Sequence, residues 1–320
     1  MDHPYRAHTY EDLLNLLPTL FGFVPYESVI GLSVSGPRCR FGFRLRHDLP
    51  EPGDEADLAS DLADHLRRHG DGGAFVVALS SDAERARVMA LALRDALPPG
   101  HGRLTLWADD ERLWTDEPGH PVEGEPWSLS DVHESRLVAI TRGEVILPDR
   151  SALLDEVAAP EGERARLLER LQHETLERLM LRAMTTDPEA FLAGERAAVA
   201  DLVDRGLREH LDEAALVELA VRAAPTHVRD DCWWRIDRGN GRRMHALWAA
   251  VSRVAGDDVA PSALCLAAFA AWQWGDGARA RVAVDRALQI DPHHRMALLL
   301  ARALDVGLHP DAWSSTRRPA

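Results

Sequence analysis

The chain has 320 residues, of which 46% are hydrophobic and 28% are charged, a balance typical of a globular protein with two domains of ordinary size. All 37 basic residues are arginines, which excludes Schiff-base lysines and the lysine of phosphate-binding loops. The net charge of −15 disfavours nucleic acids and anionic membranes as partners, because both would repel the chain.

The negative charge is concentrated in the first half of the chain. Residues 1–150 carry 15 arginines against 26 acidic residues, whereas residues 151–320 carry 22 against 26. Cys39, Cys232 and Cys265 lie in apolar stretches without a CxxC pair, which favours buried thiols in a reducing compartment. No run is apolar enough to cross a bilayer, and the polar opening MDHPYRAHTYED does not resemble a signal peptide. We therefore expect a cytoplasmic protein.

The chain begins with a predicted helix over residues 8–17, which Thr9 caps and Pro18 is expected to end. Two strands then flank a turn at Gly36-Pro37. On the first strand, the predicted buried face comprises Ile30, Leu32 and Val34. On the second strand, the predicted buried face comprises Cys39, Phe41, Phe43 and Leu45. Because apolar and polar residues alternate with a period of two, each strand should have one buried and one wet face.

A helix–strand–helix–strand succession follows this hairpin. The spacing predicts an amphipathic helix over residues 54–69, a central strand over 74–79, a helix from Asp82 to Leu97 and a strand over 103–107. A strand, a helix and a second strand in this order imply parallel neighbours joined by a right-handed crossover. The N-terminal half is therefore expected to be α/β with a mixed sheet.

The next segment, residues 108–135, is acidic and rich in proline and glycine. We expect it to form a flap over the sheet or a solvated loop. Residues 137–140 and 144–147 predict a closing pair of short strands. Pro148, a short helix from Ser151 and a breaker at 160–162 indicate a domain boundary.

We accordingly expect an α/β domain over residues 1–159, an all-helical domain over 160–312 and a flexible tail over 313–320. In the helical domain, large apolar residues of the first long segment should form one buried stripe. This predicted stripe comprises Leu167, Leu168, Leu171, Leu176, Leu179 and Met180. Asp187-Pro188 is expected to open the next helix.

Residues 275–292 contain the most specific local pattern of the helical half. Gly275-Asp276 is followed by Ala280, Ala287-Leu288 and Asp291-Pro292, which resembles the second helix of a tetratricopeptide repeat. No second copy occurs at the same period. The pattern therefore favours two helices packed as a hairpin and indicates peptide binding only weakly.

Two sets of side chains are candidates for binding a partner. They are the arginines Arg38, Arg40, Arg44 and Arg46 and the tryptophans Trp233 and Trp234. Arginine side chains suit carboxylates and phosphates, although the acidic residues from Asp48 onwards could neutralise them within the fold. Aromatic residues at helical spacing usually build a core, but two adjacent tryptophans cannot both point inward. One of them could line a groove or an interface.

A third candidate set follows the two parallel strands, where open α/β sheets usually bind their ligands. It comprises Ser80, Ser81, Asp82, Asp109 and Asp110. These residues are also ordinary loop and helix-capping residues. No catalytic constellation, cofactor motif or convincing set of metal ligands is found elsewhere in the sequence.

Four stretches together resemble a known family. They are LLNLLPTLFGFVPYESVIGLSVSG, LVAITRGEVILPDRSALLDEVAAP, VRDDCWW and CLAAFAAWQWGDGARARVAVDRALQIDPHHRMALLLARALDVGLHPD. The chain is identified as a member of domain-of-unknown-function family 4192 of actinobacteria. This resemblance implies no established activity, cofactor or catalytic residue. Family members often carry a cysteine-rich CCPPEG-like stretch, whereas the matching residues 120–124 here read HPVEG, so no metal or redox role is expected for them.

The leading hypothesis is a non-enzymatic cytoplasmic module that binds or regulates another protein. It rests on the missing catalytic constellations and on the repeat-like hairpin. The alternative is an enzyme or small-ligand-binding protein that uses the carboxyl edge of the N-terminal sheet. Neither the partner nor the oligomeric state follows from the sequence.

Overall fold

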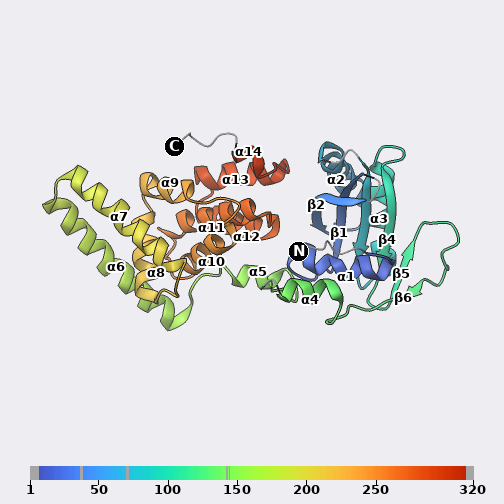
Figure 1. The fold of residues 1–320 in the computed structure, drawn as a ribbon, viewed down its shortest axis with the longest axis horizontal. Helices are drawn as coiled ribbons and strands as arrows, with labels where there is room; N and C mark the ends of the chain where they lie inside the picture. Colours follow the sequence, from blue (N-terminus) through green and yellow to red (C-terminus); the bar gives the residue numbers. More distant parts are fainter. Residues whose placement is uncertain (1–6, 37–38, 70–71, 142, 144, 315–320) are drawn as a thin grey trace. The chain divides into compact units, whose positions relative to one another are not determined.

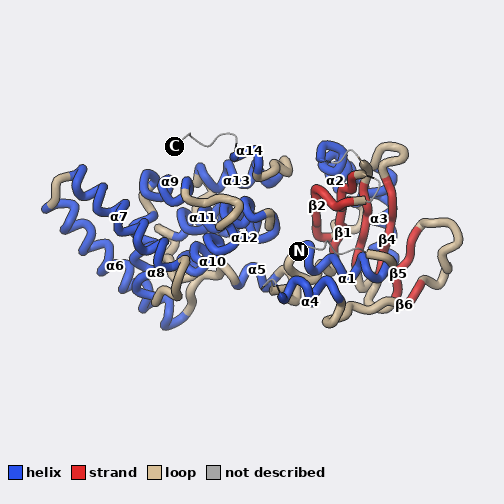
Figure 2. The backbone as a smooth tube through the Cα atoms, viewed as in Figure 1, coloured by secondary structure: helices blue, strands red, loops and turns tan. Residues whose placement is uncertain are grey.

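The computed structural model describes residues 7–36, 39–69, 72–141, 143 and 145–314, and Figure 1 labels its helices and strands. The chain divides into two compact units, residues 1–150 and 151–320. The described strands all lie in the first unit, and the second is built from helices (Figure 2). The expected fold class, a mixed sheet followed by an all-helical part, is confirmed.

The sheet has six strands in the order β2-β1-β3-β4-β5-β6. They are β1 (Ser28–Ser35), β2 (Arg40–Asp48), β3 (Ala74–Leu79), β4 (Gly102–Ala108), β5 (Arg112–Thr115) and β6 (Glu125–Pro126). Strands β3 and β4 run parallel, and the other neighbouring pairs run antiparallel. The predicted hairpin, the central strand and its parallel neighbour are therefore all present.

Helix α1 (Tyr10–Phe21) begins with a capping box in which the side chains of Thr9 and Asp12 each accept a backbone hydrogen bond. The prediction that Pro18 ends this helix is wrong, because the helix continues to Phe21 and ends at the left-handed Gly22. Proline removes one backbone hydrogen bond within a helix. Leu17 and Phe21 on either side of it are buried, and this burial offsets the loss.

Strand β1 is buried from Ser28 to Val34, so the expected wet face is wrong. Strands β2 and β3 flank it, and helices cover the sheet. The small residue Gly31 allows α2 (Glu55–His69) to approach, since a Cβ atom there would lie 2.7 Å from a methyl carbon of Leu66. Gly31, which the sequence pattern placed on the wet face, is therefore covered by α2.

One apolar cluster joins α2 and α3 (Ala83–Ala96) to one face of the sheet. Leu62, Leu66, Met89 and Leu93 supply its helical side chains, and alternate strand residues such as Val76 supply the other side. Both helices lie where the sequence predicted them. The predicted amphipathic character of α2 is confirmed, since Leu62 and Leu66 are buried on one side of the helix.

Two predictions for residues 108–147 are wrong. The acidic segment is not a featureless flap or loop, since it adds β5 and β6 to the sheet and buries Trp127, whose Nε1 donates to Asp109 O at 2.9 Å. Residues 137–140 belong to helix α4 (Glu134–Thr141), which packs against α1, and not to a strand. The local apolar run resembled a strand, but the buried Ser135 and Ala139 recur at helical spacing.

The second unit contains ten helices among the described residues. They are α5 (Ser151–Asp155), α6 (Gly162–Thr185), α7 (Pro188–Gly206), α8 (Glu213–Ala223), α9 (Thr226–Trp234), α10 (Gly241–Ser252), α11 (Ala260–Trp274), α12 (Gly277–Ile290), α13 (Arg295–Asp305) and α14 (Asp311–Ser314). Helix α5 packs on α12 and so lies within this unit. The sequence had assigned residues 151–159 to the preceding domain.

Helix α11 is the centre of this unit. It is buried from Ala260 through Gln273, and α10 and α12 pack along it. Its many alanines allow close approach on every side, as a fully buried helix requires. Helices α11 and α12 form the expected hairpin, with Gly275 in the left-handed conformation between them.

Candidate functional site

The carboxyl edge of the parallel strands gathers polar residues from four segments. Ser80 and Ser81 follow β3, and Asp82 caps α3. Because β1 runs antiparallel to β3 and pairs Ser28 with Leu79, it also brings Glu27 to this edge. The sequence analysis did not identify Glu27 as a residue of this edge. Its position one residue before β1, which pairs with β3, could have indicated it.

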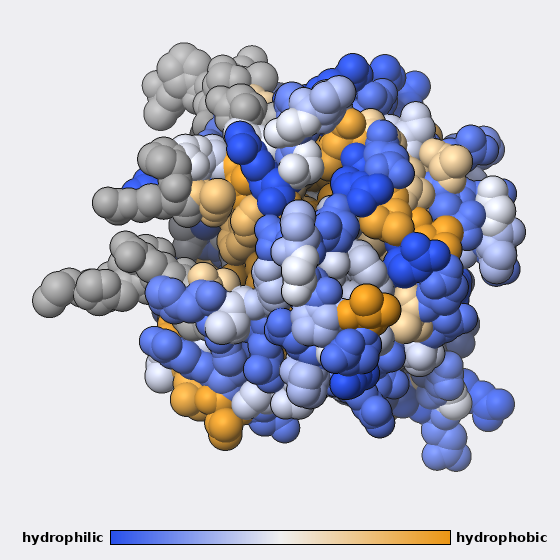
Figure 3. All heavy atoms as spheres, turned by 90° about the vertical axis from the view of Figure 1, so that its right-hand side faces the viewer, coloured by the Kyte–Doolittle hydropathy of each residue, from blue (hydrophilic) through white to orange (hydrophobic). Residues whose placement is uncertain are grey.

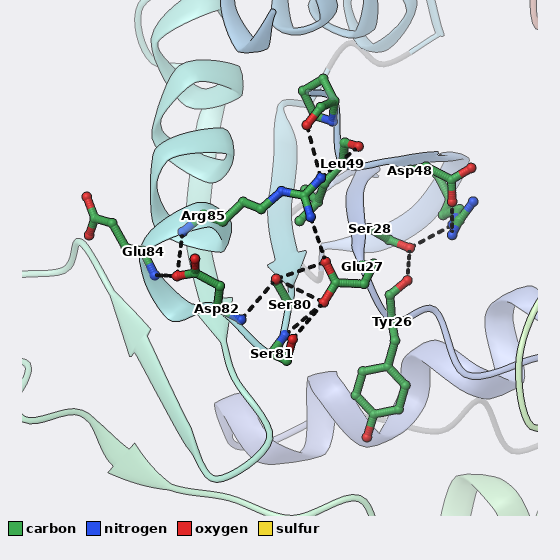
Figure 4. Close-up of polar contacts among 12 residues, drawn as sticks. Tyr26, Glu27, Ser28, Asp48, Leu49, Ser80, Ser81, Asp82, Glu84 and Arg85 are labelled. Atoms are coloured by element: carbon green, nitrogen blue, oxygen red, sulfur yellow. Dashed lines mark hydrogen bonds and ion pairs between the residues drawn. The ribbon is translucent and has the colours of Figure 1, made fainter. Parts of the chain in front are cut away.

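The Glu27 carboxylate is held by four donors at this edge (Figure 4). The Ser80 hydroxyl lies 3.0 Å from both carboxylate oxygens, and Ser81 donates through its backbone N–H at 2.9 Å and its hydroxyl at 3.2 Å. The Arg85 guanidinium donates to Oε2 at 3.1 Å. All four donors belong to the same chain, so the carboxylate is tied to the end of β3 and the start of α3.

Arg85 extends the cluster to the loop after β2. Its Nη2 donates to the carbonyl oxygens of Leu49 and Pro50 at 3.3 and 3.1 Å. Glu27 itself adopts φ 47°, a left-handed conformation that costs a non-glycine residue roughly 1–2 kcal/mol. The hydrogen bonds therefore hold a strained backbone turn in place and join the start of β1, the end of β3 and the start of α3.

The aspartates at this edge serve local structure. The Asp82 carboxylate accepts from Glu84 N at 3.0 Å and Arg85 N at 3.2 Å, as a helix N-cap does. The Asp109 carboxylate accepts from the backbone N–H groups of the next turn at 2.7 and 2.9 Å. Asp110 is exposed. The pKa of the nearby Tyr26 is raised by the partial burial of the Tyr26 hydroxyl and by the negative charge of Asp110.

The edge residues predicted from the sequence are thus brought near one another but are used in separate local interactions. Ser80 and Ser81 bind Glu27, Asp82 caps a helix and Asp109 closes a turn. No histidine or cysteine joins Glu27 in the described hydrogen bonds. The arrangement is a polar clasp that ties the start of β1 to the end of β3.

The arginines of β2 do not form one basic ladder. A β-bulge opposite the segment from Leu32 to Val34 pairs Arg44 with Leu32 but Arg40 with Ser35. Since directly paired residues project to the same face, Arg40 and Arg44 lie on opposite faces of the sheet. Arg38 lies outside the described residues. The even spacing in the sequence could not reveal the extra residue that the bulge inserts.

The four arginine positions also differ in their partners. Arg46 is 10% exposed, donates to Ser28 Oγ at 2.8 Å and pairs with Asp48 at 2.5 Å. Arg40 is exposed and makes no ion pair with the residues that the structure describes, whereas Arg44 has a partner. A bulge and charged side chains on an edge strand are typical of strands protected against pairing with other chains.

A family model described as "Domain of unknown function (DUF4192)" matches residues 11–311. The chain belongs to this family. The resemblance inferred from the sequence is therefore confirmed at the level of the family. No curated protein and no solved structure matches this DUF4192 chain.

The cysteines of this DUF4192 protein differ from expectation in one case. Cys39 is exposed in the hairpin turn with φ 44°, so the prediction that it is buried on β2 is wrong. Cys232 and Cys265 are buried, and burial raises the pKa of each thiol to about 12. Protonated thiols are poor nucleophiles at neutral pH. Within the described part of the chain, no group of three or more His, Cys, Asp or Glu side chains could hold a metal ion.

Trp233 and Trp234 lie in an aromatic cluster with Trp313 of α14. The Trp313 ring stacks on Trp233 with centroids 4.7 Å apart and on Trp234 with centroids 5.2 Å apart. Phe269 of α11 meets the edge of this stack. Trp234 remains 40% exposed, so one of the two adjacent tryptophans reaches the surface, as the sequence argument required.

The predicted apolar stripe of α6 is confirmed only in part, since Leu168 is buried and Leu171, Leu176 and Leu179 are half-buried. Only Leu168, Gln172 and Thr175 are buried on this helix, whereas Leu167 and Met180 are exposed. Apolar residues alone do not decide which face of a helix is covered, because burial also requires a neighbour. None of the described helices is both long and apolar enough to span a membrane.

The exposed residues near the end of α6 form a compact apolar surface. Met180, Leu181 and Met184 are 63%, 65% and 84% exposed. At 3.6 residues per turn, they lie on the side of α6 opposite the buried Leu168 and Thr175. By contrast, the face drawn in Figure 3 is mainly hydrophilic, with hydrophobic groups scattered between polar ones.

Proposed function

We propose that this protein is a non-enzymatic, cytoplasmic interaction or regulatory module that binds another protein through α6. The observation that carries the proposal is the exposure of Met180, Leu181 and Met184 on adjacent turns of one helix. Contiguous exposed apolar side chains are typical of protein-binding surfaces. Two of the three are methionines, whose flexible thioether side chains adapt to varied apolar partners.

The partner chemistry that best fits this surface is the apolar face of an α-helix. Neighbouring arginines on α6 already have partners, since Arg178 lies 3.6 Å from Glu218 and Arg182 lies 3.7 Å from Glu195. Recognition would therefore depend on apolar burial and on helix packing geometry. Truncation of a central apolar contact at such an interface often costs more than about 1 kcal/mol of binding free energy.

The alternative, a ligand site at the carboxyl edge of the sheet, has less support. Ser80, Ser81, Asp82 and Asp109 already bind other groups of the same chain. A ligand would have to displace the Glu27 carboxylate from its donors. No observation on these residues favours that exchange over the clasp.

A photo-crosslinking experiment with the full chain tests the proposal. p-Benzoyl-phenylalanine replaces Met184 in one variant and Val122, which is 94% exposed in the N-terminal unit, in the control. We expect a discrete protein adduct from position 184 and none from position 122. Adding Leu181→Glu to the first variant should reduce the adduct at least about tenfold, because a buried charge without a partner opposes binding.

Two outcomes would contradict the proposal. One is equal adduct formation at positions 184 and 122, which would indicate non-specific collision. The other is an adduct that Leu181→Glu leaves unchanged. Because Leu181 is mostly exposed, the Glu variant should unfold at the same temperature as the parent, which separates lost binding from lost folding.

A further inference from the structure

A second exposed apolar surface lies on α13 of the helical unit. Leu298 and Leu299 are 46% and 65% exposed, and Val306 at the end of the helix is also exposed. Met296 and Leu300 are buried on the other side of α13. At 3.6 residues per turn, Leu299 and Val306 lie two turns apart on the side that no other described helix covers.

Two arginines flank these leucines on the same side of α13. Arg295 lies one turn before Leu299, and Arg302 lies one turn after it. Both arginines are exposed, and neither side chain makes an ion pair or a hydrogen bond to the residues that the structure describes. By contrast, Arg281 on the neighbouring helix α12 pairs with two carboxylates of the same unit. The exposed side of α13 therefore combines apolar contact with two uncompensated positive charges.

The apolar surface of α6 has the opposite charge beside it. Glu174 and Glu177 lie within two turns before Leu181. Steps of three and four residues place both carboxylates on the side of α6 from which Leu181 and Met184 project. Glu174 is exposed and makes no ion pair within the described ranges of the chain, and Glu177 meets the exposed His173 at 3.2 Å. The two surfaces are thus both apolar and carry complementary charges.

The two surfaces belong to the same unit but do not meet within one chain. Helix α6 packs against α7 and α8, whereas α13 packs against α11 and α12, and Figure 1 shows the two helices apart. The surfaces can therefore meet only when α13 of one copy reaches α6 of another. Such a contact joins different surfaces of the two copies and is heterologous.

We propose that the partner bound at α6 is a second copy of this chain, which binds through the exposed side of α13. This inference rests on the proposed function, because it names the partner of the same α6 surface. In the contact, the leucines of α13 cover Leu181 and Met184, and an arginine of α13 meets Glu177. Both helices bury their exposed apolar side chains, and the opposite charges at the rim fix how they align.

The association should be weak and should continue beyond the dimer. A contact between two single helix faces lies below the roughly 1,200–2,000 Å² that specific, stable interfaces bury. The net charge of −15 also repels the copies at a distance. Because each contact leaves one α6 and one α13 surface open, further copies add until the assembly closes into a ring.

Crosslinking in the purified protein tests the proposal. The full chain with p-benzoyl-phenylalanine in place of Met184 should give an adduct of two chains, and peptide mapping should place the crosslink between α6 and α13. Adding Leu299→Glu should reduce the adduct at least about tenfold, because it buries a charge in the apolar contact. Leu299 is mostly exposed, so this variant should fold as the parent does.

Charge reversal, followed by sedimentation velocity over a range of concentrations, tests the electrostatic part. Arg295→Glu combined with Arg302→Glu should weaken the association at least about tenfold, because like charges then face each other. The matched control combines Arg243→Glu with Arg253→Glu on α10. Both are exposed arginines without an ion pair in the described part of the chain, and the net charge changes equally. The control should associate as the wild type does.

Exchanging the charges of the two surfaces is the most specific measurement. Glu174→Arg and Glu177→Arg, added to the α13 charge reversal, should restore the association that the reversal removed. An equal loss in the α10 control, or no recovery after the exchange, would overturn the proposal.

The crosslinking results also separate this proposal from the proposed function. An adduct at position 184 that forms in cell extract but not in the purified protein would overturn the second copy as partner and leave the binding role of α6 intact. An adduct that maps to α6 of both chains would overturn the role of α13 alone. No adduct in either sample would contradict both proposals.

Discussion

Helices α11 and α6 belong to the same unit and are used in opposite ways. Helix α11 is rich in alanine, and its residues from Ala260 to Gln273 are buried, whereas α6 is rich in leucine and buries only Leu168, Gln172 and Thr175. The helix with more leucines is therefore the more exposed one. Burial follows from the number of neighbouring helices, and small side chains allow more of them.

The largest expected effect comes from truncating one leucine on each helix. Leu264→Ala in α11, where Leu264 is fully buried, should lower the free energy of unfolding by roughly 2–5 kcal/mol because it leaves a cavity. Leu181→Ala in α6, where Leu181 is 65% exposed, should change it by less than about 0.5 kcal/mol. Urea denaturation of both variants measures the difference. A loss at Leu181 as large as that at Leu264 would show that α6 is covered in solution.

A smaller effect is expected from the half-buried carboxylate of Glu156, which contacts α10 and α12. Arg279 of α12 donates to Glu156 at 2.7 and 2.8 Å, and His245 Nε2 lies 3.5 Å from the same carboxylate. Burial alone would raise the pKa of Glu156, but the contacts with His245 and Arg279 outweigh it and lower the pKa to about 2. The charged form is therefore favoured in the folded protein.

A lowered pKa in the folded state means that this stabilisation is complete above the unfolded value of 4.5 and is lost as the pH falls towards 2. We expect Glu156→Gln to be less stable than the wild type at pH 7 by on the order of 2 kcal/mol. This gap should close as the pH falls from 4.5 to 2. Thermal unfolding followed by circular dichroism measures it, and a gap independent of pH would contradict the assignment.

The smallest effect concerns the exposed clasp of the N-terminal unit. Replacing Glu27 removes the hydrogen bonds from Ser80, Ser81 and Arg85, but the left-handed backbone at φ 47° remains. Glycine adopts that conformation without strain and alanine does not, so Glu27→Gly should be about 1 kcal/mol more stable than Glu27→Ala. At positions without strain, an alanine variant is usually more stable than a glycine variant. If urea denaturation finds Glu27→Ala more stable than Glu27→Gly, the backbone of residue 27 is not strained.

Several features of the fold could be predicted because they depend on neighbours in the sequence. The caps at Thr9, Asp82 and Asp187 depend on side chains that bond to backbone within three residues. The strand at 74–79 and the helix at 54–69 follow from apolar runs and periods. Local hydrogen bonding and periodicity decide these elements.

Other features depended on distant residues and were missed. The β-bulge that separates Arg40 from Arg44 arises from pairing with β1, and Glu27 reaches Ser80 only because β1 and β3 are antiparallel. The exposure of Met180 depends on the absence of a covering helix on that side of α6 among the described residues. Such contacts between distant segments produce no periodic pattern in the sequence.

The sequence by itself therefore determined the class of the fold and most elements, since these rest on composition, period and caps, and four stretches that resemble a known family identified the family. Only the tertiary structure decided which apolar faces are covered and which polar groups meet. The physical reason is that burial and side-chain contacts are properties of pairs of segments far apart in the chain. The sequence of a single segment sets its preference for helix or strand, but it does not specify which other segment packs against it.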